Sequence, residues 1–175
     1  MSKVPLYIVT GASGSGKTTV IKELRRLMPD YDVFDYDDII PFINEDKARF
    51  NKETTHLIQN IWLRVARDIA ESGRITILCG IVSPKDIEKC EDLHYFSHIY
   101  YLILHCDDKT RETRLRTRKR MTEQKIQSNL KLARSFIKNA DKYSPPMPIV
   151  DTSKTDAAKV AKQIKEWVQE QKVFI

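Results

Sequence analysis

Gly11-Ala-Ser-Gly-Ser-Gly-Lys-Thr18 is the stretch that decides the fold of this 175-residue chain. The octapeptide completes the pattern G-x-x-x-x-G-K-[ST], which places a tight glycine-rich turn between a strand and a helix. Its glycines, Gly11, Gly14 and Gly16, tolerate positive φ, so the backbone can curl and point its N–H groups at an anion. The positive end of the following helix dipole lies at the same place. The stretch therefore predicts a phosphate-binding loop.

The residues on either side of the loop have the periodicity that such a loop requires. Residues 6–9 form a short apolar run, Leu-Tyr-Ile-Val, that suits a buried parallel strand. After the loop, Val20, Leu24 and Leu27 recur at helical spacing until Pro29 interrupts the pattern. This context favours a nucleotide site over the alternative, which is a flexible Gly/Ser linker.

Side chains in and around the loop supply the chemistry of nucleotide binding. Lys17 can reach the β- and γ-phosphates, and the hydroxyl of Thr18 can ligate Mg²⁺. We therefore expect ATP and Mg²⁺ as cofactors. Nucleotide contacts are predicted for Gly11, Ser13, Gly14, Ser15, Gly16, Lys17, Thr18 and Thr19.

Length and composition indicate one domain with an ordinary core. Hydrophobic residues make up 41% of the chain and charged residues 31%, which is typical of a globular protein. No apolar run approaches the roughly 20 residues of a membrane span, and the first strand follows the N-terminus without a visible signal segment. Cys79, Cys90 and Cys106 show no C-x-x-C pairing, which favours a reducing compartment. We expect a cytoplasmic protein with no membrane partner.

The net charge of +6 is concentrated in one short segment. Residues 109–120 contain seven basic side chains and one acidic side chain, so the rest of the chain carries 23 of each sign. A surface that binds nucleic acid usually spreads its charge over several elements. The concentrated charge instead fits a compact anion such as a triphosphate, and a nucleic-acid partner is not expected.

Apolar strand-like runs alternate with helical patterns along the chain. Strands joined by crossover helices form a parallel sheet that is covered on both faces, and ligands bind such sheets at the carboxyl ends of the strands. The expected strands are residues 6–10, 32–35, 75–80, 98–105 and 148–150, and the expected helices are residues 17–28, 53–72, 84–90, 108–120, 122–142 and 155–171.

The second expected strand ends in acids, whereas the third, residues 75–80, contains none. If the extended conformation continues past Asp35, side chains alternate, and Asp35 and Asp37 share a side. Asp35 would then hold Mg²⁺ beside the phosphate loop, and Asp37 would accept a hydrogen bond and a proton from a substrate hydroxyl. The alternative is helix capping, and Asp38 is the expected cap of a short helix that starts near Ile39.

The basic segment has the spacing of a phosphate-binding helix face. Arg111, Arg114 and Arg118 lie at i, i+3 and i+7, and guanidinium groups bind phosphate with two parallel hydrogen bonds. We expect Arg114 and Arg118 to close over a transferring phosphoryl group. The alternative is a solvated helix face, which we also favour for Arg134 on the next helix.

Three weaker patterns concern a substrate-stacking tryptophan, a metal site and a GTPase switch. Trp62 lies on an apolar helical face, where core packing is the simpler interpretation and stacking on a substrate is the alternative. Cys90, His94 and His98 are spaced by four residues, but residues 95–97 lead into a strand, so a metal site is not expected there. The chain has no N-K-x-D and no D-x-x-G motif, which argues against a GTPase switch.

With these features in this order, the chain resembles the small P-loop kinases of the shikimate, gluconate, nucleoside and nucleoside-monophosphate kinase superfamily. The resemblance spans almost the whole chain. It implies a three-layer α/β/α P-loop NTPase fold, with a five-stranded parallel sheet in the order 2-3-1-4-5, a lid and a substrate-binding lobe.

The resemblance also implies roles for individual residues. In shikimate-kinase-like members, the first acid of a D-x-D after the second strand helps to bind Mg²⁺, and the second contacts the acceptor; Asp35 and Asp37 match these positions. Arg114 and Arg118 match the R-x-x-x-R element of the family's lid. Residues 149–155 are similar to a closing segment that packs near the adenine base, which implies a nucleotide contact for Thr152.

These observations predict an ATP-dependent phosphotransferase that acts on a small metabolite such as a nucleoside, nucleotide or sugar acid. Its single domain would span residues 1–175, with a substrate lobe at about 37–72 and a lid at about 114–124. Two alternatives remain open at this point: a nucleotide-binding NTPase or sensor without an acceptor, and a polynucleotide 5′-hydroxyl kinase. The sequence does not name the acceptor or the oligomeric state. Catalytic roles are predicted for Lys17, Asp37, Arg114 and Arg118, and metal ligation for Thr18 and Asp35.

Overall fold

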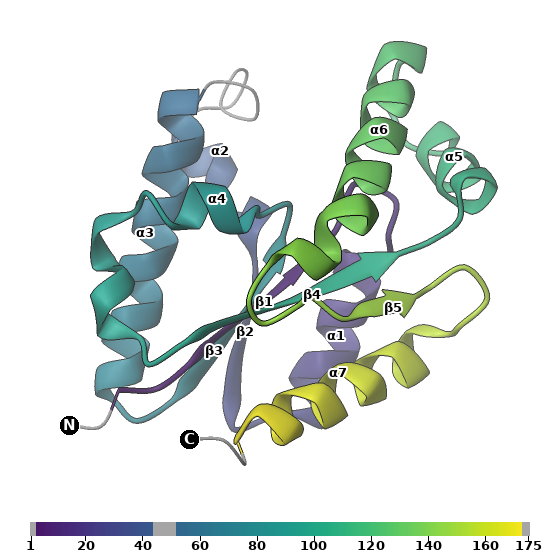
Figure 1. Ribbon diagram of the computed structural model, residues 1–175. Coiled ribbons are helices and arrows are strands. Elements are labelled where there is room, and N and C mark those ends of the chain that lie inside the picture. The colour runs from purple at the N-terminus through teal and green to yellow at the C-terminus, as the bar shows by residue number, and fades with distance from the viewer. Residues whose placement is uncertain (1–2, 44–51, 173–175) are drawn as a thin grey trace.

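A parallel β-sheet forms the middle layer of the protein (Figure 1). The computed structural model describes residues 3–43 and 52–172, and within these ranges the sheet has five strands in the order β2-β3-β1-β4-β5. Every neighbouring pair of these strands is parallel, so the predicted fold class and strand order are confirmed. The strands are β1 (Leu6–Thr10), β2 (Tyr31–Asp35), β3 (Ile75–Gly80), β4 (Ile99–His105) and β5 (Ile149–Asp151).

Helices cover both faces of the sheet (Figure 1). On one face, α1 and α7 pack together over the side chains of β1 and β4. On the other face, α3 and α4 lie over the β2–β3–β1 half, and α6 lies toward β4 and β5. The described helices are α1 (Lys17–Leu27), α2 (Ile40–Ile43), α3 (Lys52–Glu71), α4 (Pro84–Ile87), α5 (Asp108–Arg116), α6 (Glu123–Asn139) and α7 (Ala157–Lys172), and the 3-10 helices are η1 (Tyr36–Ile39), η2 (Glu91–Tyr95) and η3 (Ala140–Lys142).

The position of β1 in the middle of the sheet explains why its sequence is an unbroken apolar run. Tyr7 and Val9 face α1 and α7, whereas Leu6 and Ile8 face α3. All four side chains are fully buried, because a parallel strand in the middle of the sheet has helices on both sides. The Trp62 side chain belongs to the same core: it is buried, and its indole N–H donates to the Tyr36 carbonyl. Core packing is therefore the observed role of Trp62.

The strand β2 ends at Asp35, as predicted. The extended conformation considered for the two residues after it is absent, because the chain turns into the 3-10 helix η1. The cause is a cap: the Asp35 carboxylate accepts a hydrogen bond from the Asp37 N–H at 3.0 Å. The capping residue is therefore Asp35 and not Asp38, whose carboxylate lies 3.8 Å from the Arg25 guanidinium.

Other helix boundaries also differ from the expected ones. The helix expected over residues 84–90 is the single turn α4, followed by the 3-10 turn η2. The helix expected to reach residue 120 ends at Arg116, and Arg120 takes a positive φ of 62° in the connection to α6. The next helix begins at Glu123 because the Thr122 hydroxyl accepts from the Lys125 N–H.

A close packing contact sets the distance between η1 and the end of β3. A Cβ atom added to Gly80 would lie 2.3 Å from the Cβ of Tyr36, which is far inside van der Waals contact. Only glycine therefore allows η1 to lie against the carboxyl end of β3 in this way. The contact brings η1, with its acids, to the same edge of the sheet as the phosphate loop.

Candidate active site

The predicted residues of the second strand and of the phosphate loop meet at the carboxyl edge of the sheet. They line a narrow cavity of about 40 Å³ between the loop, η1 and the end of β3. This cavity, called the acceptor cleft below, is lined by Ser13, Gly14, Gly16, Lys17, Thr18, Asp35, Asp37, Gly80, Ile81 and Arg118. The structure thus brings together the candidate lysine, the candidate metal ligands and the candidate acceptor-binding acid.

A second and larger cavity of about 370 Å³ lies on the other side of the loop. We call it the nucleotide cavity. The start of α1, the α5–α6 connection and the segment after β5 form its walls, which are lined by Gly14, Gly16, Thr19, Val20, Arg114, Thr117, Arg118, Thr152, Thr155, Ala157 and Val160. Its lining combines apolar side chains with threonine hydroxyls, which suits a base and a ribose. Gly14, Gly16 and Arg118 line both cavities.

Lys17 is folded back onto its own loop. Its ammonium group donates to the carbonyls of Gly11 at 2.5 Å and Ala12 at 3.2 Å, and lies 3.4 Å from the Ser15 hydroxyl. Burial lowers the pKa of Lys17 to about 8, although the nearby carboxylates of Asp37 and Asp35 act in the opposite direction. The ammonium group is therefore held at the loop and lies within electrostatic reach of both acids.

The outward-facing carbonyls of the phosphate loop are held by donors from distant parts of the chain. The Gly14 carbonyl accepts from the Arg114 guanidinium at 3.1 Å and from the Cys106 thiol at 3.5 Å. The Ser15 carbonyl accepts from the Thr152 hydroxyl at 2.9 Å. In a trans peptide the N–H points away from the preceding carbonyl, so these contacts leave the next N–H groups pointing toward the opposite side.

Thr152 is the point at which β5 is tied to the loop. It is buried, and its hydroxyl lies within hydrogen-bond distance of the Ser15 and His105 carbonyls. Arg114 donates both to this hydroxyl, at 3.1 Å, and to the Thr152 carbonyl, at 2.8 Å. The predicted nucleotide contact of Thr152 thus lies at the wall of the nucleotide cavity, and its hydroxyl is shared with the protein.

The candidate arginines occupy three different environments. Arg111 is fully buried and donates to the loop carbonyls of Ala12 and Ser13, so the expectation that it faces phosphate was wrong. Arg114 is bound to Gly14 and Thr152, as described above. Arg118 lies beyond the end of α5, is exposed, and borders both cavities. Of these three arginines, Arg118 is the one that borders both cavities.

Other basic residues of this region are neutralised at the surface. The Arg116 guanidinium forms ion pairs with Glu112 and with Glu123, the latter at 2.8 Å. Arg134 pairs with Asp108 at 2.6 Å and is exposed, in agreement with the surface interpretation. The charge of the segment is therefore smaller in effect than its sequence indicates, because carboxylates of α5 and α6 offset part of it.

Two contacts of the loop were not predicted. The Ser13 N–H donates to the side-chain carbonyl of Asn129 on α6 at 3.0 Å. The Thr10 hydroxyl donates to the Val82 carbonyl and accepts from the Val82 N–H, which joins the end of β1 to the segment after β3. Neither Asn129 nor Thr10 belongs to a motif, and each acts on a residue more than 70 positions away, so the sequence carried no local signal for them.

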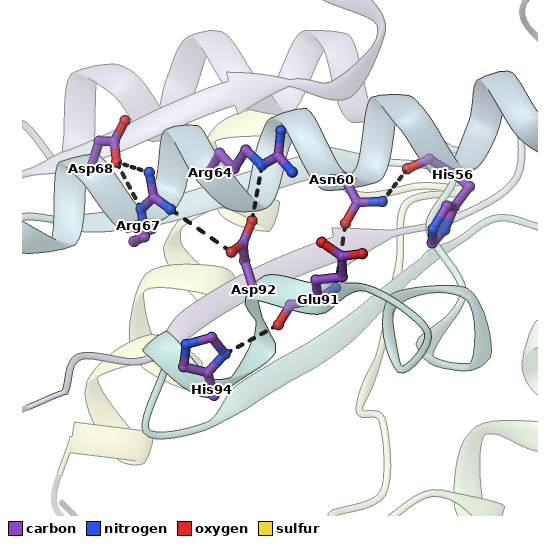
Figure 2. A network of polar contacts seen from close by, with 8 residues as sticks. All are labelled: His56, Asn60, Arg64, Arg67, Asp68, Glu91, Asp92 and His94. Atoms are coloured by element: carbon purple, nitrogen blue, oxygen red, sulfur yellow. Dashed lines mark hydrogen bonds and ion pairs between the residues drawn. The ribbon is translucent and has the colours of Figure 1, made fainter.

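A polar network joins α3 to η2 (Figure 2). The buried Asp92 carboxylate on η2 accepts from Arg64 at 3.2 Å and lies 3.8 Å from Arg67, and both arginines belong to α3. Asn60 on the same helix accepts from the Glu91 N–H at 3.4 Å. These contacts bind η2 to α3.

His94 and His98, two members of the Cys90, His94 and His98 pattern, make separate contacts in the structure. The imidazole of His94 contacts the Glu91 carbonyl, and the ring of His98 stacks on Tyr100. Among the residues that the structure describes, no group of three or more His, Cys, Asp or Glu side chains is arranged to hold a metal ion. Burial raises the pKa of the Cys79 thiol to about 12, which disfavours the reactive thiolate form.

A protein family can be assigned to this chain. The profile of the AAA domain family matches residues 8–134, which include the phosphate loop, both acids and the basic segment. The chain belongs to this family. No protein of curated function matches the sequence.

Solved structures of kinases share the fold of this family member. A sugar kinase from Janibacter sp. HTCC2649 matches with a TM-score of 0.70 and 14% identity, over 96% of this chain and 95% of that chain. Shikimate kinase from Acinetobacter baumannii, solved in complex with shikimate, matches with a TM-score of 0.64 and 18% identity, over 98% and 96%. A putative kinase from Chloroflexus aurantiacus j-10-fl has a TM-score of 0.66 and 17% identity, over 97% and 98%. At these identities, the likeness establishes a P-loop kinase fold.

Across residues 3–43 and 52–172, none of the helices combines the length and the apolar character needed to cross a membrane.

Proposed function

We propose that the protein is an ATP-dependent phosphotransferase that transfers the γ-phosphoryl group to a hydroxyl or phosphate of a small metabolite. One observation carries the proposal: the acceptor cleft and the nucleotide cavity meet at the phosphate loop, and Arg118 borders both. A phosphoryl donor and an acceptor would therefore lie on either side of one basic side chain. The sugar kinase and the shikimate kinase that share the fold support this class of reaction.

The nucleotide cavity would hold the base and ribose, and the loop would hold the phosphates. Gly14 and Gly16 have positive φ values of 85° and 91°, which give the loop the curled backbone of an anion-binding nest. Lys17 would leave the Gly11 and Ala12 carbonyls and bind the β- and γ-phosphates when ATP enters. Thr19 and Thr152 would complete the nucleotide contacts at the wall of the cavity.

The donor set of the cleft fits Mg²⁺. The Thr18 hydroxyl is exposed at the start of α1, and the Asp35 carboxylate borders the same cleft, so two oxygen ligands of the type that Mg²⁺ prefers lie beside the phosphates. When bound, the ion would offset the charge of the β- and γ-phosphates. Asp35 is also fixed in place, because its carboxylate caps η1.

Asp37 would bind the acceptor. Its side chain is exposed at the cleft, opposite the loop and next to Gly80 and Ile81. A carboxylate there can accept a hydrogen bond from an acceptor hydroxyl and take its proton. Arg118, with Arg114 behind it, would stabilise the charge of the transferring group and exclude water when the lid at about 114–124 closes.

We propose a small acceptor such as a nucleoside, nucleotide or sugar acid, whose reacting group would lie at the cleft. The lobe at about 37–72 would supply further contacts to it, within a single domain of 175 residues. Part of that lobe, residues 44–51, lies outside the described residues. We propose a cytoplasmic location, since such metabolites and ATP occur there.

A panel assay tests the proposal. Purified protein with ATP and Mg²⁺ is offered nucleosides, nucleotides and sugar acids, and ADP release is measured with product identification by mass spectrometry. We expect ADP release that depends on one class of acceptor. ATP binding with slow hydrolysis and no stimulation by any acceptor would support an NTPase or sensor instead. Steeply salt-dependent binding of a 5′-hydroxyl oligonucleotide, with transfer to its end, would support a polynucleotide kinase.

A further inference from the structure

Arg111 is a buried cation beneath the phosphate loop. Its side chain is 0% exposed, and it is the largest of the fully buried side chains in the described part of the chain. The guanidinium donates to the carbonyls of Ser13 at 2.7 Å, Ala12 at 3.2 Å and Cys106 at 3.3 Å. Its Nε atom is buried and has no hydrogen-bond partner among the residues that the structure describes.

The charge of Arg111 is not offset by an ion pair. Within residues 3–43 and 52–172, no carboxylate lies within ion-pair distance of it. The two nearest acids are engaged elsewhere: the Asp107 carboxylate accepts from Thr110, and Asp108 pairs with Arg134. Burying a cation without a counter-ion is unfavourable, and an apolar residue would avoid that cost, as Leu115 does one turn later.

The position of the guanidinium explains what the cation does for the loop. It holds the Ala12 and Ser13 carbonyls on one side of the backbone, and the planar trans peptide then directs the Gly14 N–H to the other side. The aliphatic part of the side chain also supports Gly14, since a Cβ there would lie 3.2 Å from the Arg111 Cγ. Arg111 thus orients the nest from behind and adds a full positive charge to it.

We propose that Arg111 is a positioning residue for polyphosphate, and that the phosphates of the bound nucleotide are the counter-charge of its buried guanidinium. The inference rests on the proposed function, in that the loop binds a nucleotide. It assigns this chain a preference that rises with the number of phosphates. The reason is that the attraction between a buried charge and a ligand grows with the charge of the ligand and is only weakly screened.

Binding of ATP, ADP and AMP without Mg²⁺ tests the proposal, by competition with a fluorescent ATP analogue. Arg111→Met removes both the charge and the hydrogen bonds. We expect this variant to weaken the binding of ATP by about 100-fold, of ADP by about tenfold and of AMP by less than about threefold. Arg111→Lys keeps the charge, so the ratio of ATP to AMP affinity should stay within about threefold of wild type.

Two control variants separate this effect from surface charge and from stability. Arg116→Met removes one exposed positive charge from the same helix, and it should change each affinity by less than about twofold. Asp92→Asn breaks the network of Figure 2 between α3 and η2, and it should lower the melting temperature with the affinity ratio unchanged. Arg111→Gln is a second neutral variant that retains one donor, and it decides the question if Arg111→Met does not fold.

The outcomes are distinct. A loss that is equal for all three nucleotides would show a merely structural role for Arg111 and overturn the proposal, as would an unchanged ratio in the folded neutral variants. A wild-type chain that binds ATP, responds to Arg111→Met as expected and yet phosphorylates no acceptor would contradict the proposed function alone. A wild-type chain that binds none of the three nucleotides would overturn both.

Discussion

The two sides of the site are built in different ways. On the nucleotide side, hydrogen bonds join residues far apart in sequence: Arg111 binds Ser13 across 98 positions, and Thr152 binds Ser15 across 137. On the acceptor side, the Asp35 carboxylate accepts a hydrogen bond from the N–H of Asp37, only two residues away. The 3-10 helix η1 is held by the packing of Tyr36 on Gly80. The nucleotide side is thus organised before ligand arrives, whereas the acceptor side presents exposed groups, Asp37 and Ile81, on a packed support.

The difference has a functional meaning. Phosphate binding requires many N–H groups to point at one place, so a network of donors must orient the loop. Binding of an acceptor needs a few groups at the right distance, and packing supplies that. Variants on the nucleotide side should therefore impair both binding and transfer, while variants on the acceptor side should impair transfer alone.

The largest effect is expected for Lys17→Ala. Loss of the ammonium group removes the charge that would bind the β- and γ-phosphates, so transfer should fall by at least about 10³-fold and ATP binding should weaken as well. ADP release measures the transfer, and calorimetry measures the binding of ATP. Lys22→Ala, which removes an exposed charge from the same helix, is the matched control and should be nearly silent. Transfer retained in Lys17→Ala would contradict the assigned role.

Asp37→Asn separates the two sides most clearly. It removes the proton acceptor but keeps the shape, so kcat for acceptor-dependent transfer should fall by about 10²-fold or more while ATP affinity stays within about twofold. Asp38→Asn is the control, because it changes the neighbouring exposed acid that pairs with Arg25. An equal loss of ATP affinity and of kcat in Asp37→Asn would mean that the two sides are not separable.

Gly80→Ala tests the packing that supports the acceptor side. The new Cβ would overlap Tyr36, so η1 must move; we expect a stability loss of about 2 kcal/mol and a KM for the acceptor raised by about tenfold. Gly73→Ala is the control: its φ of 80° disfavours alanine, but the added Cβ meets nothing within 4 Å. Thermal unfolding and steady-state kinetics compare the two. The same rise of KM in both variants would show that destabilisation alone is responsible.

The smallest effect is a pH dependence of nucleotide affinity. The pKa of Lys17 in the ligand-free protein is lowered to about 8, so the amine loses its proton as the pH rises through that value. ATP affinity should therefore be highest well below pH 8, where Lys17 is protonated, and should fall by roughly eightfold between about pH 7.5 and about pH 9, where the phosphates are already ionised. Lys17→Met should bind weakly and show no such fall. A flat profile in the wild type would mean that Lys17 keeps its proton.

Sequence patterns predicted the elements that depend on local chemistry. The glycines, Lys17 and Thr18 mark the loop because few other sequences can curl a backbone around a phosphate and then start a helix. The apolar runs predicted the strands, since a strand buried on both faces excludes polar side chains. The resemblance to small P-loop kinases implied the strand order, which the structure confirms.

Errors occurred where two local signals compete. A D-x-D after an apolar strand fits both an extended strand and a capped turn, and the cap was formed by the first acid instead of the later one. Asp35 and Asp37 still border the same cleft, and η1 packs on the end of β3 through Tyr36 and Gly80. The predicted grouping of the two acids thus has a different cause from the expected alternation of side chains.

The sequence alone determined the phosphate loop, the positions of the acids and the density of arginines after β4. Tertiary structure decided which arginine does what: Arg111 is buried beneath the loop, Arg114 ties the loop to Thr152, and Arg118 borders both cavities. Helical spacing predicts only that these arginines share one face of a helix. The packing partner of that face, contributed by residues about 100 positions away, decides which side chain meets carbonyls and which meets the ligand.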